Sequence, residues 1–305
     1  MKNSIVYSFV FYFSILFAAI LMLRTGDLDL SKINLNSGFI ISILFLISGF
    51  LFYPFILNMI LKFHGIPSNY TSCFTALGTT IFSKYIPGKV AMVYAIAYKL
   101  KIQKESEQFS KLFIYVIIFQ VYIIIGGIVT GLFSVFQLEM ISPFIKFISL
   151  GLIILSFFSL QSKYMFEKFT LIISKIVKSK FSVPCFKRKQ IFILLCLSTF
   201  FWLIWGMGIY FFIDSTGIQI INPIHVIFLF PFSVSVGIVA VFSPGGFGIR
   251  EGVFAGLLIA LGSSISSAAE ISILSRIWFI LGEIIFFLIS TIFPYLYTLY
   301  IKRHK

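Results

Sequence analysis

Long apolar stretches constrain this chain more than any other feature of its sequence. Six of them are long enough to cross a bilayer, at roughly 4–24, 38–61, 110–136, 142–162, 190–213 and 270–300, because a hydrocarbon core about 30 Å thick takes about 20 helical residues. Only 11% of the residues are charged, whereas soluble proteins hold about 25%. The sequence therefore predicts an all-α polytopic membrane protein with about six transmembrane helices, forming a single membrane domain over 1–305.

Two further apolar regions are each interrupted by a Pro-Gly pair, at Pro87-Gly88 and at Pro244-Gly245. Proline lacks an amide donor and glycine adopts backbone angles that other residues avoid, so each pair ends a helix. The pieces on either side are mostly too short to span a bilayer. We therefore expect two re-entrant helical hairpins, at 71–99 and at 225–262. The alternative is that one of them spans the membrane completely.

The distribution of basic residues favours one orientation of these segments. With a cytoplasmic N-terminus and both hairpins re-entrant, most of the 24 lysines and arginines fall in cytoplasmic segments, and only Arg24, Lys32 and Lys146 fall outside. This asymmetry is typical of membrane proteins with cytoplasmic basic loops. It makes the hairpins enter from opposite faces, so that 1–162 and 190–305 form inverted repeats. In transporters such repeats flank a binding site near the midplane.

The segment 163–189 between the two halves carries apolar residues at helical spacing with lysines on the other side. This pattern predicts a cytoplasmic amphipathic helix on anionic headgroups. A solvated connector whose charges only fix the topology explains it equally well. The formal net charge of +14 gathers in such short segments, so we expect membrane lipids as partners and no nucleic acid.

Basic residues inside the apolar segments are the first candidates for a functional site. Lys84, Lys89 and Arg250 lie next to the two breaks, and a cation buried at membrane depth needs an anion. The helix N-termini that follow the breaks add partial positive charge. Together they predict a ligand that bears phosphate. The alternative for the two lysines is that they snorkel to the cytoplasmic surface and only anchor the hairpin.

Acidic residues complete the set of candidates. Glu251 is placed to cap its own helix, and Arg276 and Glu283 lie seven residues apart on one face of the last helix. We expect Glu251 to pair with Arg276, which leaves Arg250 for the ligand. The alternative is a structural network of Arg276 with Glu283. Several other polar side chains can offer hydrogen bonds to a headgroup, although most such residues pack or lie at the interface: Tyr85, Tyr94, Tyr98, Gln120 and Tyr122.

Other functional signatures are missing from the sequence. It has no Walker loop, no dinucleotide fingerprint and no nucleophile elbow, so we expect no cofactor. An intramembrane transferase with Glu251 or Glu283 as base would lack a nucleophile, and we expect no enzyme activity. The histidines and cysteines show no metal-ligand spacing, so we expect no metal site and unpaired thiols. They are His64, His225, His304, Cys73, Cys185 and Cys196.

Two short motifs carry a resemblance to a known family. Lys84-Tyr-Ile-Pro-Gly-Lys89 and Pro244-Gly-Gly-Phe-Gly-Ile-Arg-Glu-Gly252 together resemble the membrane region of lysylphosphatidylglycerol synthases and the wider flippase-like family of bacterial and archaeal integral membrane proteins. The resemblance covers essentially the whole chain. Its motif residues fall on Lys84, Pro87, Gly88, Lys89, Pro244, Gly245, Gly246, Gly248, Arg250 and Glu251.

The resemblance implies a lipid flippase-type domain in the cytoplasmic membrane, with both termini inside. In the full synthases a soluble aminoacyl-transferring domain follows this region, whereas this chain ends after its last helix, so we do not expect synthase activity. We expect a translocase that moves an anionic, phosphate-bearing or modified lipid between leaflets. Arg250 and Lys89 would hold phosphate, Lys84 would gather the lipid, and Glu251 and Arg276 would gate. The alternative is a non-transporting subunit that presents a lipid-linked sugar or phospholipid to a partner glycosyltransferase or lipid-modifying enzyme.

Overall fold

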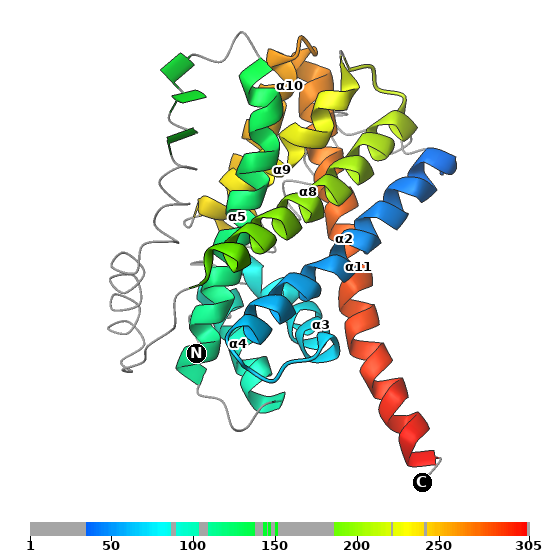
Figure 1. Cartoon of the computed structure of the whole chain (residues 1–305). Helices are drawn as coiled ribbons and strands as arrows, with labels where there is room; N and C mark the ends of the chain where they lie inside the picture. The colour runs from blue at the N-terminus through cyan, green and yellow to red at the C-terminus, as the bar shows by residue number, and fades with distance from the viewer. Residues whose placement is uncertain are drawn as a thin grey trace.

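The computed structural model describes residues 35–86, 90–103, 109–137, 186–220, 222–240 and 243–303, with short helical pieces between 143 and 151. All regular structure in these segments is helical (Figure 1). Four of the described helices are long and apolar enough to cross a membrane, and the fourth is apolar over Ile265–Phe293. They are α2 (Ser37–Phe63), α5 (Phe109–Gln137), α8 (Arg188–Thr216) and α11 (Ile265–Arg303).

These four helices confirm four of the six stretches expected from the sequence. Their ends lie within about five residues of the expected ends. The expected helix at 4–24 lies outside the described residues, as does most of the one at 142–162. The expected amphipathic segment 163–189 also lies outside them, apart from its last four residues. An all-helical membrane fold is therefore confirmed in the described part, while the number of spans remains a prediction.

The long helices begin and end where the sequence offers capping groups. The Asn36 side chain accepts a hydrogen bond from Phe39 N (3.0 Å) at the start of α2. Ser264 Oγ accepts one from Ser267 N (3.1 Å) at the start of α11. Such caps satisfy amides that have no partner inside the helix. Gly217 ends α8 in the left-handed conformation, as is common at helix C-termini.

Both Pro-Gly regions are broken into two helices, as the sequence predicts. The first consists of α3 (Tyr70–Thr79), the 3-10 turn η2 (Ile81–Tyr85) and α4 (Val90–Gln103). The second consists of α9 (Val226–Val239), preceded by the turn η3 (Pro223–His225), then the turn η4 (Pro244–Gly246) and α10 (Ile249–Ala260). Pro87, Gly88 and Lys89 lie outside the described residues. Each of the four helices is shorter than a bilayer-spanning helix needs.

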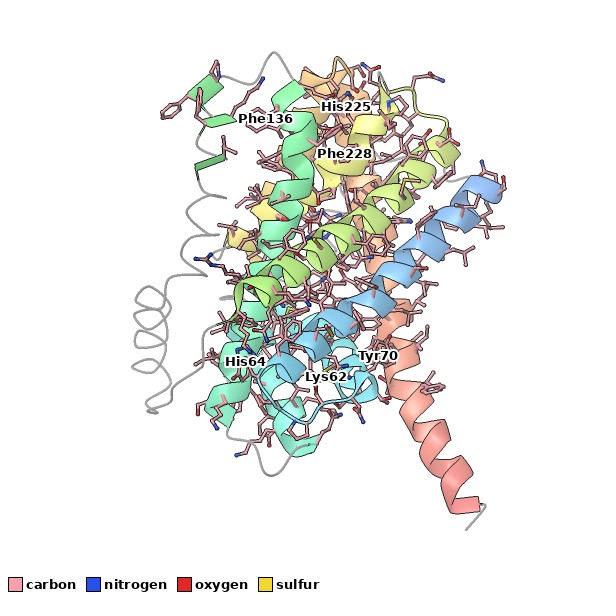
Figure 2. All side chains as sticks on the ribbon, in the orientation of Figure 1. Lys62, His64, Tyr70, Phe136, His225 and Phe228 are labelled. Carbon is pink, nitrogen blue, oxygen red and sulfur yellow. The ribbon has the colours of Figure 1, made fainter. Side chains whose placement is uncertain are left out.

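The two broken regions lie at opposite ends of the molecule. Figure 1 shows α3 and α4 in its lower half and α9 and α10 in its upper half, with α11 running past both. Figure 2 places Lys62 and His64 at the end near α4 and His225 at the other end. The turns η2 and η4 contact each other between these ends. This opposed arrangement is the one that inverted hairpins would produce; their depth in a membrane stays a prediction.

Buried tryptophans join the long helices around this meeting point. Trp202 Nε1 donates to Ile123 O (2.7 Å), and Trp205 Nε1 donates to Leu46 O (3.1 Å). Trp278 Nε1 lies 3.2 Å from the Ser42 hydroxyl. All three indoles are at most 5% exposed. Each indole thus buries apolar area and also satisfies its polar nitrogen.

Candidate functional site

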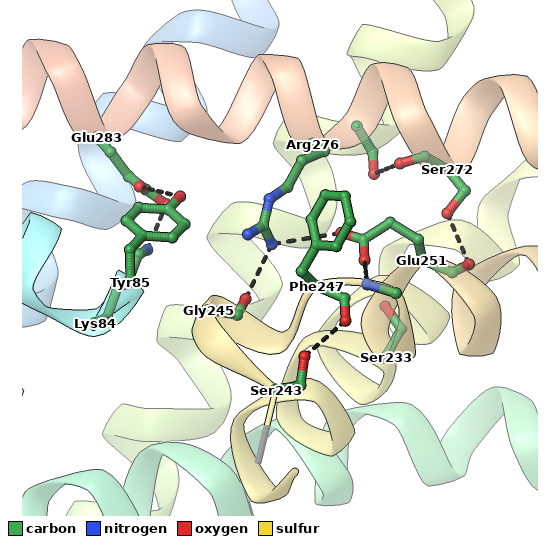
Figure 3. Close-up of polar contacts among 12 residues, drawn as sticks. Lys84, Tyr85, Ser233, Ser243, Gly245, Phe247, Glu251, Ser272, Arg276 and Glu283 are labelled. Carbon is green, nitrogen blue, oxygen red and sulfur yellow. Dashed lines mark hydrogen bonds and ion pairs between the residues drawn. The ribbon is translucent and has the colours of Figure 1, made fainter. Parts of the chain in front are cut away.

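The first break is joined to α11 by a buried carboxylate. Glu283 is 1% exposed. One of its oxygens forms an ion pair with Lys84 Nζ, and the other accepts a hydrogen bond from the Tyr85 hydroxyl at 2.8 Å (Figure 3). Lys84 therefore lies against α11 within the protein, as the predicted site requires and against the alternative that it snorkels to the surface. Glu283 pairs with Lys84 across the fold, and the alternative pairing with Arg276 is wrong.

The second break is joined to the same helix by Arg276. Its Nη1 donates to the Gly245 carbonyl (3.0 Å) and lies 3.4 Å from Glu251 Oε1. The other Glu251 oxygen accepts a hydrogen bond from Gly248 N (2.6 Å). Glu251 therefore caps α10 with one oxygen and contacts Arg276 with the other. Figure 3 shows these contacts meeting around the turn. Both predictions for Glu251, the cap and the pairing with Arg276, are confirmed in geometry.

Glycine is required where the two breaks touch. Gly245 has a φ of +60°, and a Cβ there would lie 2.8 Å from the Tyr85 ring. Gly246 has a φ of +74°, and its Cβ would lie 2.9 Å from the Gly237 carbonyl oxygen. Side chains strain both positive φ and such close contacts. The Pro244–Gly246 turn thus brings its backbone directly against Tyr85 of the other break.

Arg250 is the exceptional charge of this region. It is 3% exposed, and its guanidinium carbon lies 4.9 Å from the ring centre of Phe230 and 4.8 Å from that of Phe279. No described carboxylate pairs with it, and its buried Nη2 has no hydrogen-bond partner among the described residues. A buried charge without an anion is costly in a low-dielectric interior. The arrangement therefore favours an anion from outside the chain.

A cavity of about 290 Å³ opens beside Arg250. Its charged lining residues are Lys84, Arg250 and Arg276, and most of the remaining wall is apolar. Both breaks, α5 and α8 contribute side chains to it. Ligand pockets typically enclose about 300–1,000 Å³, so this cavity lies at the lower end of that range. A largely apolar space with basic groups at one side fits an anionic amphiphile.

The site brings together most of the residues singled out in the sequence. Lys84, Arg250, Glu251, Arg276 and Glu283 meet around the two turns. Gly248 occupies the N-cap position of α10, where its amide donates to Glu251, and Pro244 begins the turn η4. The proposed phosphate ligand Lys89 cannot be placed, because it lies outside the described residues.

Sequence reasoning missed the two phenylalanines that hold the Arg250 guanidinium. Phe230 and Phe279 are two of the chain's 40 phenylalanines, and nothing in their local sequence distinguishes them. Tyr85 and Gln120 were marked only as general hydrogen-bonding groups. The structure gives Tyr85 a specific acceptor in Glu283, and it places Gln120 in the cavity wall, donating to the Tyr53 hydroxyl at 3.1 Å.

Metal ligands do not cluster in the part of the chain that the structure describes, where no three His, Cys, Asp or Glu side chains are placed to hold an ion. Cys73 is buried and Cys196 is exposed, and Cys185 lies outside the described residues. Around the two turns the structure places three cations, two paired carboxylates and apolar walls.

Comparison with other proteins adds no assignment. The chain matches no model of a known protein family, and it matches no characterised protein. The resemblance to the lysylphosphatidylglycerol synthase membrane region thus remains a prediction from the two motifs.

Proposed function

We propose that this protein is a lipid translocase that moves an anionic, phosphate-bearing lipid between leaflets, with the headgroup held between the two broken helical regions. The observation that carries the proposal is Arg250, which is 3% exposed, lacks a described anionic partner and lines the cavity. A phosphate oxygen in the cavity would supply the missing acceptor. Guanidinium groups bind phosphate through paired, charge-assisted hydrogen bonds.

The opposed breaks support a path for the headgroup. The turns η2 and η4 contact each other, and both line the cavity through Lys84 and Gly245. Irregular backbone at membrane depth is tolerated where it is buried in protein or lines a cavity. Each hairpin would open toward its own leaflet, and the cavity between them would hold the headgroup midway.

The two ionic contacts on α11 would control that path. Lys84 is paired with Glu283, and Arg276 is bound to Gly245 and Glu251. An arriving phosphate would compete with these carboxylates for the cations, since both are anions. When the phosphate replaces Glu283 or Glu251 as the partner of the cation, the corresponding broken region would lose its ionic contact with α11. In this proposal Lys84 and Arg276 gate the path and Arg250 binds the phosphate.

Lipid movement in vesicles tests the proposal. The purified protein is reconstituted into phosphatidylcholine vesicles that contain a trace of fluorescent phosphatidylglycerol, and a membrane-impermeant quencher reports how much label crosses. Arg250→Gln should slow movement by about tenfold or more, because a charge-assisted hydrogen bond contributes about 1.5–3 kcal/mol. Arg188→Gln changes an exposed arginine at the start of α8 and serves as the matched control.

Two outcomes would speak against transport. If the wild-type protein and empty vesicles quench alike, the chain does not move this lipid. If the lipid is retained by the purified protein but not moved, the site presents a lipid to a partner enzyme instead. Equal rates for wild type and Arg250→Gln would remove Arg250 from the site.

A further inference from the structure

The lining of the cavity has charge of one sign only. Lys84, Arg250 and Arg276 line it, whereas no carboxylate is among its described lining residues. All three side chains belong to the wall of this one cavity, which brings the cations close together. Lys84 and Arg276 are paired with carboxylates, so a cation entering this space would meet repulsion mainly from Arg250, while an anion would be attracted.

Both nearby carboxylates are already bound to protein groups. Glu283 holds Lys84 and Tyr85, and Glu251 holds Gly248 N and lies against Arg276. Among the described residues, three positive and two negative side chains leave this region with one unbalanced positive charge. The unbalanced group is Arg250, whose Nη2 has no partner among the described residues. One negative charge on the ligand restores neutrality, and an additional ammonium on the same headgroup would cancel that balance.

An ammonium would also find few other acceptors. The Gly245 carbonyl accepts from Arg276, and the rings of Phe230 and Phe279 already face the Arg250 guanidinium. Trp202 and Trp205 line the cavity, and indole faces attract cations weakly. That weak attraction does not offset the unbalanced positive charge of Arg250, so the charge balance decides.

The walls indicate that the anion arrives on a lipid. Phe50, Ile81, Met92, Val121 and Val234 contribute apolar surface to the lining. A free phosphate or glycerol phosphate would leave this surface without a partner, whereas the first methylenes of acyl chains would cover it. Burial of apolar area stabilises a bound lipid but adds nothing for a small hydrated anion.

We propose that this site selects lipids whose headgroup is a monoanionic phosphodiester without an ammonium group, and that it discriminates against zwitterionic and aminoacylated headgroups. The inference deepens the proposed function and rests on the same cavity. It departs from what the resemblance to lysylphosphatidylglycerol synthases implies, since a lysyl headgroup carries two ammonium groups into a space lined by cations. An aminoacylated lipid would need a carboxylate that the described lining does not offer.

Retention of defined lipids tests the headgroup preference separately from transport. The full-length protein is exchanged into detergent with equimolar phosphatidylglycerol, phosphatidylethanolamine, phosphatidylcholine and lysylphosphatidylglycerol of identical chains, and native mass spectrometry counts the bound species. We expect phosphatidylglycerol to exceed each of the others by about tenfold or more. Soluble glycerol 3-phosphate is measured in parallel through its effect on the thermal midpoint, where we expect no shift at concentrations at which the lipid gives one.

A near-isosteric substitution should abolish the preference. Gln120 lines the cavity and donates to Tyr53, so Gln120→Glu keeps the side-chain shape and adds the missing carboxylate. We expect the ratio of phosphatidylglycerol to phosphatidylethanolamine to fall by about tenfold. Gln137→Glu makes the same change at the exposed end of α5 and should leave the ratio unchanged.

The outcomes separate this inference from the proposed function. Equal retention of all four lipids, or a preference for any ammonium-bearing one, overturns the inference, even if vesicles show lipid movement. Retention of none, or an equal shift with glycerol 3-phosphate, overturns it as well. Selective retention of phosphatidylglycerol without movement in vesicles supports the inference and overturns transport.

Discussion

Removal of the buried acid on α11 tests whether the first break is anchored inside the protein. Glu283→Leu leaves the Lys84 ammonium without its carboxylate and the Tyr85 hydroxyl without its acceptor. Loss of one partner of a buried ion pair costs about 3–5 kcal/mol. The Lys84 side chain is 21% exposed and can turn toward the cavity, so the lower end, about 3 kcal/mol, applies here. At about 2–4 °C per kcal/mol, the thermal midpoint should fall by roughly 6–12 °C.

The double variant Lys84→Met with Glu283→Leu should recover most of this loss. Two apolar side chains replace the pair without leaving a buried charge, a change that is often neutral or stabilising. The Tyr85 hydroxyl still loses its hydrogen bond to Glu283, at a cost of about 1 kcal/mol. The double variant should therefore melt above the Glu283→Leu single variant, although it carries one more substitution.

Intrinsic tryptophan fluorescence in detergent follows the transition, because all three tryptophans of the chain are buried. Lys62→Met, at an exposed position at the end of α2, serves as the control and should change stability by less than about 0.5 kcal/mol. Two results would contradict the interior pairing and return Lys84 to the membrane surface. In the first, the thermal midpoint of Glu283→Leu decreases by less than 2 °C. In the second, the stability losses of the two single variants simply add in the double variant.

Three further predictions address the second break and the long helices. Gly245→Ala should lower stability by about 2 kcal/mol or more, since positive φ and a close ring contact coincide there. Gly248 has a φ of +80° but open space around it, so Gly248→Ala should lower stability less in the same melting assay. Arg276→Met should lower the thermal midpoint by leaving Glu251 without its cation, and adding Glu251→Gln should restore part of it; no restoration would mean that the pair is not formed. Cys196 is exposed on the apolar helix α8, and a variant that keeps only this cysteine tests whether lipid covers that face. Its thiol should react with a charged maleimide in detergent and should not react in intact membranes.

The local features of this site were predictable from sequence because they depend on neighbouring residues. A Pro-Gly pair ends a helix wherever it occurs, which located both breaks. Glu251 three residues after Gly248 predicts a cap, and the capping contact is present. Arg250 and Glu251 are adjacent and point to different sides of a helix start, so the sequence could anticipate that Arg276 takes the acid and leaves Arg250 without it.

The pairing of Lys84 with Glu283 could not be predicted in the same way, because 199 residues separate them. Which acid meets which base depends on how α3, α4 and α11 cross, and that follows from shape matching over many apolar side chains. The sequence therefore offered Arg276 as a partner for Glu283, at helical spacing, whereas packing brought Lys84 there. The contacts of Phe230 and Phe279 with Arg250 could not be predicted for the same reason.

The two anchors on α11 also set a constraint on its length. Arg276 holds one break and Glu283 holds the other, seven residues further along the same helix, a separation of about 10 Å along its axis and nearly two whole turns. One residue inserted between them would rotate one anchor by about 100° relative to the other and advance it by about 1.5 Å. The two breaks would then no longer face α11 together, whichever residue was inserted. In this helix the number of residues between the anchors is as much a part of the site as the anchors themselves.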